Sequence, residues 1–178
     1  MTFGVTQAEG VVAVPGGFGG LGSVYGSFQD YTTQTGSTTA GVPFTFDTDD
    51  FNGAGGITIS NSSRIAIPYD GIYNLQWSGQ FSSDDTNSTD TWVWVRKNGT
   101  TNIVGSTGKI GLVARKNPGQ PSHAISGWNY FLSLNATDYI EIYWLKETSN
   151  ITLTTFPANV SPAYPSTASV IATIMKVG

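Results

Sequence analysis

A strict alternation of apolar and polar residues distinguishes residues 71–81 from the rest of the chain. The apolar side chains share one parity: Tyr73, Leu75, Trp77 and Phe81. The even positions from 74 to 80 are Asn, Gln or Ser. Successive side chains of a strand point to opposite faces of its sheet, so this pattern predicts a half-buried strand. A turn at 68–71 precedes it, and we expect the strand to form the centre of a sheet.

The remaining pattern from residue 23 onward is also that of short strands. Eight to ten strands separated by Gly, Pro, Asn and Asp clusters are typical of an antiparallel sandwich or jelly roll, and no helix is predicted. Asn98-Gly99 is a favoured hairpin turn. Residues 124–134 and 139–146 are expected to pair, joined at 135–138. The other expected strands are 23–29, 43–46, 57–59, 63–67, 91–97, one or two within 103–113, 151–156 and 169–177.

The last strand, residues 169–177, is apolar on both parities. Val170, Ala172 and Ile174 form one side, and Ile171, Met175 and Val177 form the other. A strand that is apolar on both faces must be covered on both. One face can meet the core of the domain, and the other then requires a neighbouring subunit. These six residues are therefore the candidate subunit interface.

Residues 1–22 form a separate segment that fits neither a helix nor a strand. Gly and Pro interrupt its apolar side chains, which are Val11, Val12, Val14, Phe18 and Leu21. A disordered terminus is one interpretation. Disordered tails are usually polar, however, so we favour an extended arm that orders on a sister subunit or on a larger particle. The domain itself is expected to span 23–178.

Composition limits the partners of this protein. Charged residues make up 11% of the 178 residues, against roughly 25% in ordinary domains, and the net charge is −4. Nucleic acid binding would require a basic face, so it is not expected. No segment is long and apolar enough to span a membrane, and the N-terminal residues do not resemble a secretory signal. The absence of cysteine excludes disulfides and thiolate chemistry.

Catalytic and metal-binding patterns are absent from the sequence. His123 is the only histidine, and a zinc site would need carboxylates at a spacing that is not found. No Gly-x-Ser-x-Gly context accompanies the many serines. Asp47, Asp49 and Asp50 cluster in one expected loop, and Asp84, Asp85 and Asp90 in another. Neither cluster matches a twelve-residue Ca²⁺ loop, so we interpret both as solvated loops and predict no catalytic residue, metal or cofactor.

Five tryptophans raise the alternative of carbohydrate stacking. They all lie within expected strands, where packing in the core or at a subunit interface is the commoner role. Trp92 and Trp94 share a parity and should lie on one face. The five residues are Trp77, Trp92, Trp94, Trp128 and Trp144.

Several segments together resemble a known family. Residues 68–75, Pro-Tyr-Asp-Gly-Ile-Tyr-Asn-Leu, resemble the Pro-x-x-Gly-x-Tyr-x-Phe motif of C1q/TNF-like jelly rolls. The closing strand 169–177 resembles the C-terminal strand near the three-fold axis of that family. Other segments resemble small C1q-like proteins of tailed bacteriophages: 25–28, 63–65, 71–76, 95–99, 128–142 and 169–171.

The resemblance implies an all-β, C1q/TNF-like jelly roll that forms a homotrimer on a virion. The preferred hypothesis is a non-enzymatic capsid decoration or cement protein, made in the host cytoplasm and anchored to the major capsid protein by the arm 1–22. The alternative is the receptor-binding head of a tail fibre or spike, which would recognise host surface glycan through loops 82–90 and 114–122. No collagen-like stalk precedes the domain, which disfavours a long fibre tip.

Overall fold

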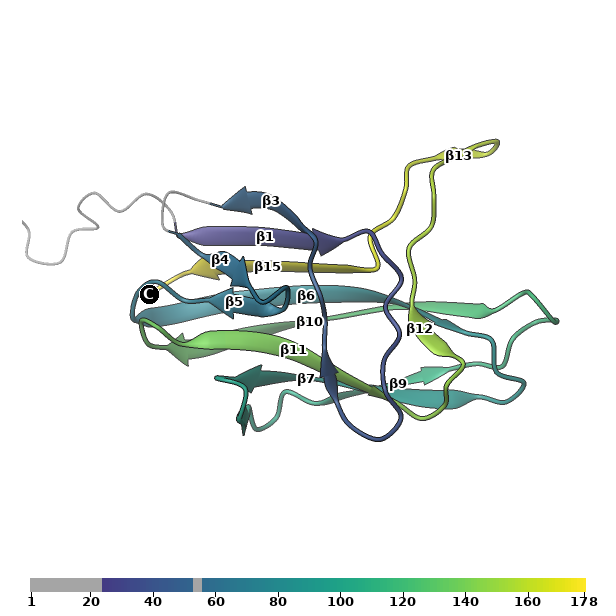
Figure 1. The fold of residues 1–178 in the computed structure, drawn as a ribbon, viewed down its shortest axis with the longest axis horizontal. Coiled ribbons are helices and arrows are strands. Elements are labelled where there is room, and N and C mark those ends of the chain that lie inside the picture. The colour runs from purple at the N-terminus through teal and green to yellow at the C-terminus, as the bar shows by residue number, and fades with distance from the viewer. Residues whose placement is uncertain (1–23, 53–55) are drawn as a thin grey trace, which may run out of the picture.

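The computed structural model describes residues 24–52 and 56–178, and these form a two-layer antiparallel sandwich (Figure 1). Six strands make one sheet, seven make the other, and a two-stranded hairpin stands apart. The predicted arm 1–22 lies outside the described residues. The strands are β1 (Tyr25–Asp30), β2 (Val42–Pro43), β3 (Thr48–Asn52), β4 (Thr58–Ser60), β5 (Arg64–Ala66), β6 (Gly71–Ser83), β7 (Thr89–Lys97), β8 (Thr101–Asn102), β9 (Gly108–Leu112), β10 (Ser122–Leu134), β11 (Tyr139–Lys146), β12 (Ile151–Leu153), β13 (Asn159–Val160), β14 (Ala163–Tyr164) and β15 (Val170–Lys176).

The strand predicted as a sheet centre has that position. The first sheet, here called the front sheet, has the order β10-β6-β15-β1-β3, with β12 also paired to β6. β6 is therefore hydrogen-bonded on both sides. On one side β10 pairs with its whole length, and on the other side β15 and β12 pair with it. Its predicted alternation is confirmed, because Tyr73, Leu75, Trp77 and Phe81 are all buried.

The second sheet, here called the back sheet, has the order β4-β5-β11-β7-β8, with β2 paired to β11 and β9 paired to β7. Aromatic rings from both sheets and from the segment before β3 fill the space between them. Phe44 packs edge-on against Trp77 and Trp144, at ring-centroid distances of 5.7 and 6.5 Å. Phe81 of the front sheet meets Trp144 of the back sheet at 6.1 Å. This interlocked cluster is the centre of the core.

Three details of the predicted strand pattern were wrong. β10 and β11 do not pair with each other, because β10 joins β6 in the front sheet and β11 joins β7 in the back sheet. Thr48–Asn52, expected as an acidic loop, is the edge strand β3, paired to β1. Most of 43–46 is not a strand, although Phe44 and Phe46 are buried. Several further strands have only two or three residues, too short to produce a recognisable alternation.

The Asn98-Gly99 turn is confirmed and is fastened to a second turn. Both residues have positive φ, 52° and 69°, as the two central positions of a tight hairpin require. Asn98 Nδ2 donates to Asp138 Oδ1 at 2.7 Å, in the turn between β10 and β11. Asp138 Oδ2 accepts from Asn135 N at 2.9 Å and lies 3.4 Å from Lys97 Nζ. One buried carboxylate therefore joins two turns at the same end of the sandwich.

The Asp138 contacts make stability depend on pH in the acid range. The Asn135 N–H, the Asn98 amide and the Lys97 charge hold the pKa of Asp138 below its ordinary value. A carboxylate with a lowered pKa contributes stability above its unfolded pKa of about 3.9, and loses it as the pH falls through the folded pKa. The free energy of unfolding, measured in denaturant, should fall less between pH 5 and pH 2.5 in Asp138→Asn than in the wild type. The control is Asp84→Asn, which removes an exposed ion pair and should show the same pH dependence as the wild type. Parallel wild-type and Asp138→Asn profiles would contradict this assignment.

Candidate functional surface

The outward side of the front sheet carries no Asp, Glu, Lys or Arg on four of its six strands, which are β10, β6, β15 and β1. Paired residues of adjacent strands share a face, so the registers identify which positions point away from the core. We call this surface the front face. Its positions are Ile72, Asn74, Gln76, Ser78, Gln80 and Ser82 of β6; His123, Ile125, Gly127, Asn129, Phe131 and Ser133 of β10; Ile171, Thr173 and Met175 of β15; and Tyr25, Ser27 and Gln29 of β1.

Large apolar side chains are exposed on this uncharged surface. Ile125 is 75% exposed, Phe131 is 68% exposed and Met175 is 49% exposed. Phe51 of β3 continues the face beyond β1, because it pairs with Ser27. Tyr25, Phe51 and Met175 border a groove of about 260 Å³ whose floor includes Thr173. Charge depletion with exposed aromatic and Met side chains is characteristic of the core of a protein–protein interface.

Amide side chains order the polar part of the front face. Asn74 and Asn129 lie on the neighbouring strands β6 and β10 and exchange two side-chain hydrogen bonds, of 3.2 and 3.0 Å. Gln29 Nε2 donates to the Asp50 carboxylate at the β3 edge. Because these polar groups already bond to one another, they can be covered by a partner without losing all their hydrogen bonds.

The structure divides the predicted interface residues between two environments. Val170, Ala172 and Ile174 are at most 1% exposed and lie in the core of the sandwich, so they have no surface to offer a partner. Ile171, Met175 and Val177 are exposed, and they remain the part of the prediction that an interface can use. The arm residues Val11, Val12, Val14, Phe18 and Leu21 lie outside the described residues.

Sequence reasoning missed most of the front face. Ile125 and Phe131 were counted as sheet residues of 124–134, but their parity is opposite to that of the buried Leu132 and Leu134. A signal was present, because Ile125 and Phe131 place large apolar residues on the parity opposite to Leu132 and Leu134. Trp128 made the inward and outward parities of this strand hard to tell apart. It has the inward parity, yet it is 49% exposed at the sheet edge, where it stacks on Tyr130.

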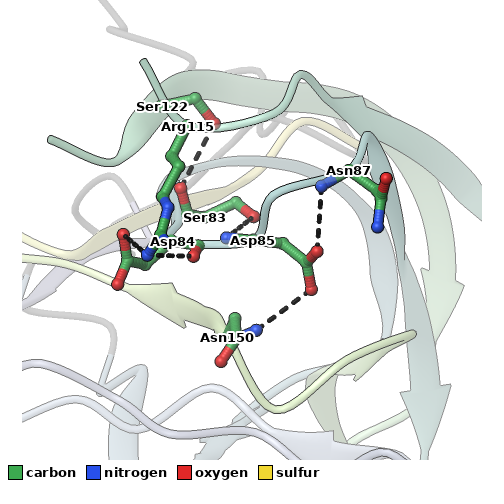
Figure 2. Close-up of polar contacts among 7 residues, drawn as sticks. All are labelled: Ser83, Asp84, Asp85, Asn87, Arg115, Ser122 and Asn150. Carbon is green, nitrogen blue, oxygen red and sulfur yellow. Dashed lines mark hydrogen bonds and ion pairs between the residues drawn. The ribbon is translucent and has the colours of Figure 1, made fainter. Parts of the chain in front are cut away.

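The two loops proposed for receptor contact do come together at one end of the sandwich (Figure 2). Arg115 Nη1 donates to the backbone O and to Oδ1 of Asp84, at 3.3 and 3.1 Å. Ser122 Oγ donates to Ser83 O at 3.4 Å. Asp85 accepts from Asn87 N at 3.0 Å and from Asn150 Nδ2 at 3.0 Å. Asn150 therefore attaches a third loop to the pair.

These hydrogen bonds also explain the local electrostatics. The Asn87 N–H, followed by the Asn150 amide, lowers the pKa of Asp85 and keeps it ionised. Asp90 lies apart from Asp84 and Asp85 and pairs with Lys109 Nζ at 2.6 Å. Within 24–52 and 56–178, no group of three or more His, Cys, Asp or Glu side chains is arranged to bind a metal ion. The carboxylates hold the loops in place.

The remaining candidate residues have packing roles. The ring of His123 meets Phe156 edge-on at 5.0 Å. Trp77 and Trp144 are buried in the core, as predicted for tryptophans in strands. Trp92 and Trp94 lie on one face, as predicted, and this is the outer face of the back sheet. There Lys109 Nζ lies 5.8 Å from the Trp92 ring centroid, and Arg96 Cζ lies 3.9 Å from the ring centroid of Tyr143 and 5.9 Å from that of Trp94.

In the described part of the chain, no helix has the length and apolar character needed to cross a lipid bilayer.

Comparisons with known proteins identify the fold. No family model matches the sequence, and no curated protein matches it. The structure is similar to the globular domain of zebrafish complement 1qA protein, with a TM-score of 0.50 and 10% sequence identity. The match covers 88% of this chain and 98% of that chain. The predicted C1q/TNF-like jelly roll is therefore confirmed.

Proposed function

We propose that this chain is a non-enzymatic structural protein of a phage virion, and that it forms a homotrimer through its front face and decorates the capsid. The observation that carries the proposal is the uncharged front face with its exposed Ile125, Phe131 and Met175. An uncharged face that exposes several large apolar side chains is typical of a surface that contacts another protein. The three-fold arrangement and the virion setting come from the resemblance to C1q-like phage proteins.

The energetics favour association through this face. Each large apolar side chain that becomes buried contributes about 1.5–3 kcal/mol before the cost of association is subtracted. The outward positions of β10, β6, β15 and β1 carry no charged side chain, so covering them carries no penalty of burying an unpaired charge.

Two measurements test the proposal. Sedimentation equilibrium of the purified chain should give a mass of three chains. Antibody labelling of virions under the electron microscope should place the protein on the head shell, in the high copy number expected of a decoration protein. A stable monomer in solution, or labelling confined to the tail, would contradict it.

The arm 1–22 is proposed as the capsid anchor. Burying its five large apolar side chains on the major capsid protein would contribute several kcal/mol, at about 1.5 kcal/mol or more for each. We expect a chain lacking residues 2–22 to remain a trimer but to bind depleted capsids much more weakly than the full chain, as measured by co-sedimentation. Full occupancy by the truncated trimer would show that the anchor lies elsewhere.

The second candidate function is the glycan-binding head of a tail fibre or spike. It is favoured by the junction of loops 82–90 and 114–122, which places the polar residues of both at one end of the domain (Figure 2). Binding of the purified trimer to host surface polysaccharide, lost in Arg115→Ala, together with labelling of the tail, would support this function over capsid decoration.

A further inference from the structure

A hairpin on a long connection projects from the sandwich between β12 and β15. Its two strands, β13 and β14, pair through Asn159 with Tyr164 and Val160 with Ala163. Figure 1 shows this hairpin projecting from the sandwich near the start of β15, with its tip away from both sheets. Val160 near its tip is 92% exposed, and Tyr164 is 47% exposed. The described chain therefore offers no surface of its own against which Val160 packs.

The base of the projection is firmly attached to the domain. Phe156 and Thr167 form an isolated antiparallel bridge, in which Thr167 N donates to Phe156 O at 2.9 Å. Gln80 of β6 holds both arms, because its side-chain Nε2 donates to Thr167 Oγ1 at 3.1 Å and its backbone O accepts from Thr154 N at 2.8 Å. The hairpin is thus directed outward by the front sheet.

The tip is held in shape by its own residues. Asn159 Nδ2 donates to Ser161 O at 3.0 Å and to Pro162 O at 3.2 Å. Pro157, Pro162 and Pro165 restrict the backbone, which reduces the entropy that a contact would cost. An isolated two-stranded hairpin is only marginally stable in water. A hairpin whose tip is held by its own hydrogen bonds and exposes Val160 is therefore suited to packing against another surface.

The chemistry of the projection matches that of the front face. Residues 154–169 contain no Asp, Glu, Lys or Arg. A hollow at its base is lined by Gln80, Ile125, His123, Phe156, Tyr164 and Thr167, of which the first three belong to the front face. The uncharged surface is therefore continuous from the sheet to the base of the hairpin.

We propose that the β13–β14 hairpin clasps a neighbouring copy of this chain, with Val160 and Tyr164 as its contact residues. The proposal rests on the homotrimer proposed above, and the occupant follows from the continuity of the hairpin base with the face through which the copies associate. A hairpin that rises from beside Gln80 and Ile125 of the front face can contact a neighbour packed on that face.

Cross-linking tests the contact between the hairpin and a neighbouring copy directly. The chain contains no cysteine, so a single introduced cysteine is the only site that a maleimide labels. A single Val160→Cys chain is labelled with a photoactivatable maleimide, mixed with isotopically heavy chain, reassembled and irradiated. Mass spectrometry should find cross-links between light and heavy chains. Val104→Cys, 99% exposed in the connection between β8 and β9, is the matched control and should give none.

A second variant measures the contribution of the contact. In Val160→Ser/Tyr164→Ser, we expect the trimer to dissociate at a protein concentration about tenfold higher than in the wild type. Val104→Ser/Val113→Ser, with two exposed apolar residues outside the front face, should dissociate like the wild type.

The outcomes separate this proposal from the one on which it rests. A chain that sediments as a trimer but shows only cross-links within one chain overturns the clasp and leaves the trimer standing. Cross-links on virions to the major capsid protein, without any between copies, also overturn it. A monomeric chain overturns both proposals.

Discussion

Thr173→Lys is expected to convert the proposed trimer into monomers. Thr173 lies in the middle of the front face, paired with Gln76 of β6 and Ser27 of β1. A lysine there would have to be dehydrated on association, although no outward-facing position of β10, β6, β15 or β1 carries a carboxylate to pair with it, and symmetry would bring like charges together. The loss should be several kcal/mol of association free energy, seen as a shift from trimer to monomer in sedimentation velocity at micromolar protein.

Thr58→Lys is the matched control for this variant. Thr58 is exposed on β4 of the back sheet, so the same substitution is made on the opposite side of the sandwich. We expect it to sediment as the wild type does. If Thr173→Lys also remained a trimer, association through the front face would be excluded.

Trp144→Ala should cause the largest loss of stability from a single substitution in this chain. Trp144 is 1% exposed and meets Phe44 and Phe81, one from each side of the core. Gly36 also packs so tightly against it that an added Cβ would lie 2.7 Å from the ring. Removing a fully buried tryptophan costs about 3–5 kcal/mol, a large share of the roughly 5–15 kcal/mol that stabilises a typical domain.

The measurement is the free energy of unfolding from denaturant titration, made on the monomeric Thr173→Lys background so that assembly does not contribute. Trp128→Ala, which removes the same side chain from a half-exposed position, should cost much less. Equal costs for the two substitutions would mean that the Phe44–Trp144–Phe81 cluster is not the centre of the core.

The sequence allowed the fold class and the central strand to be predicted because both depend on local alternation. Tyr73, Leu75, Trp77 and Phe81 share one parity, interrupted only by Gly79, and their burial follows from that period of two. Sheet membership depends instead on long-range pairing. The turn at 135–138 joins β10 to β11, yet the chain crosses there from the front sheet to the back sheet. A crossing and a hairpin have the same local composition, so this could not be inferred.

The candidate surface could be predicted only in part for the same reason. Two apolar parities in 169–177 indicated an uncovered face, and the exposure of Ile171 and Met175 agrees with this. The extension of that face to Phe131 and Tyr25 depends on which strands flank β15. Likewise, three aspartates in 47–50 indicated a loop, because an acidic edge strand such as β3 looks like one until its pairing with β1 is known.

The β3 edge has a consequence for how copies of the protein can add to one another. An edge strand with unpaired backbone groups is a template for another strand, and proteins commonly block it with charge or a bulge. β3 carries Asp49 and Asp50, and its register with β1 shifts between Ser27 and Phe28. Blocking one edge of the front sheet is enough to prevent strand-by-strand growth into a fibre, since such growth needs two open edges in every copy. Strand addition at β3 is therefore disfavoured as a way for copies of this chain to add to one another.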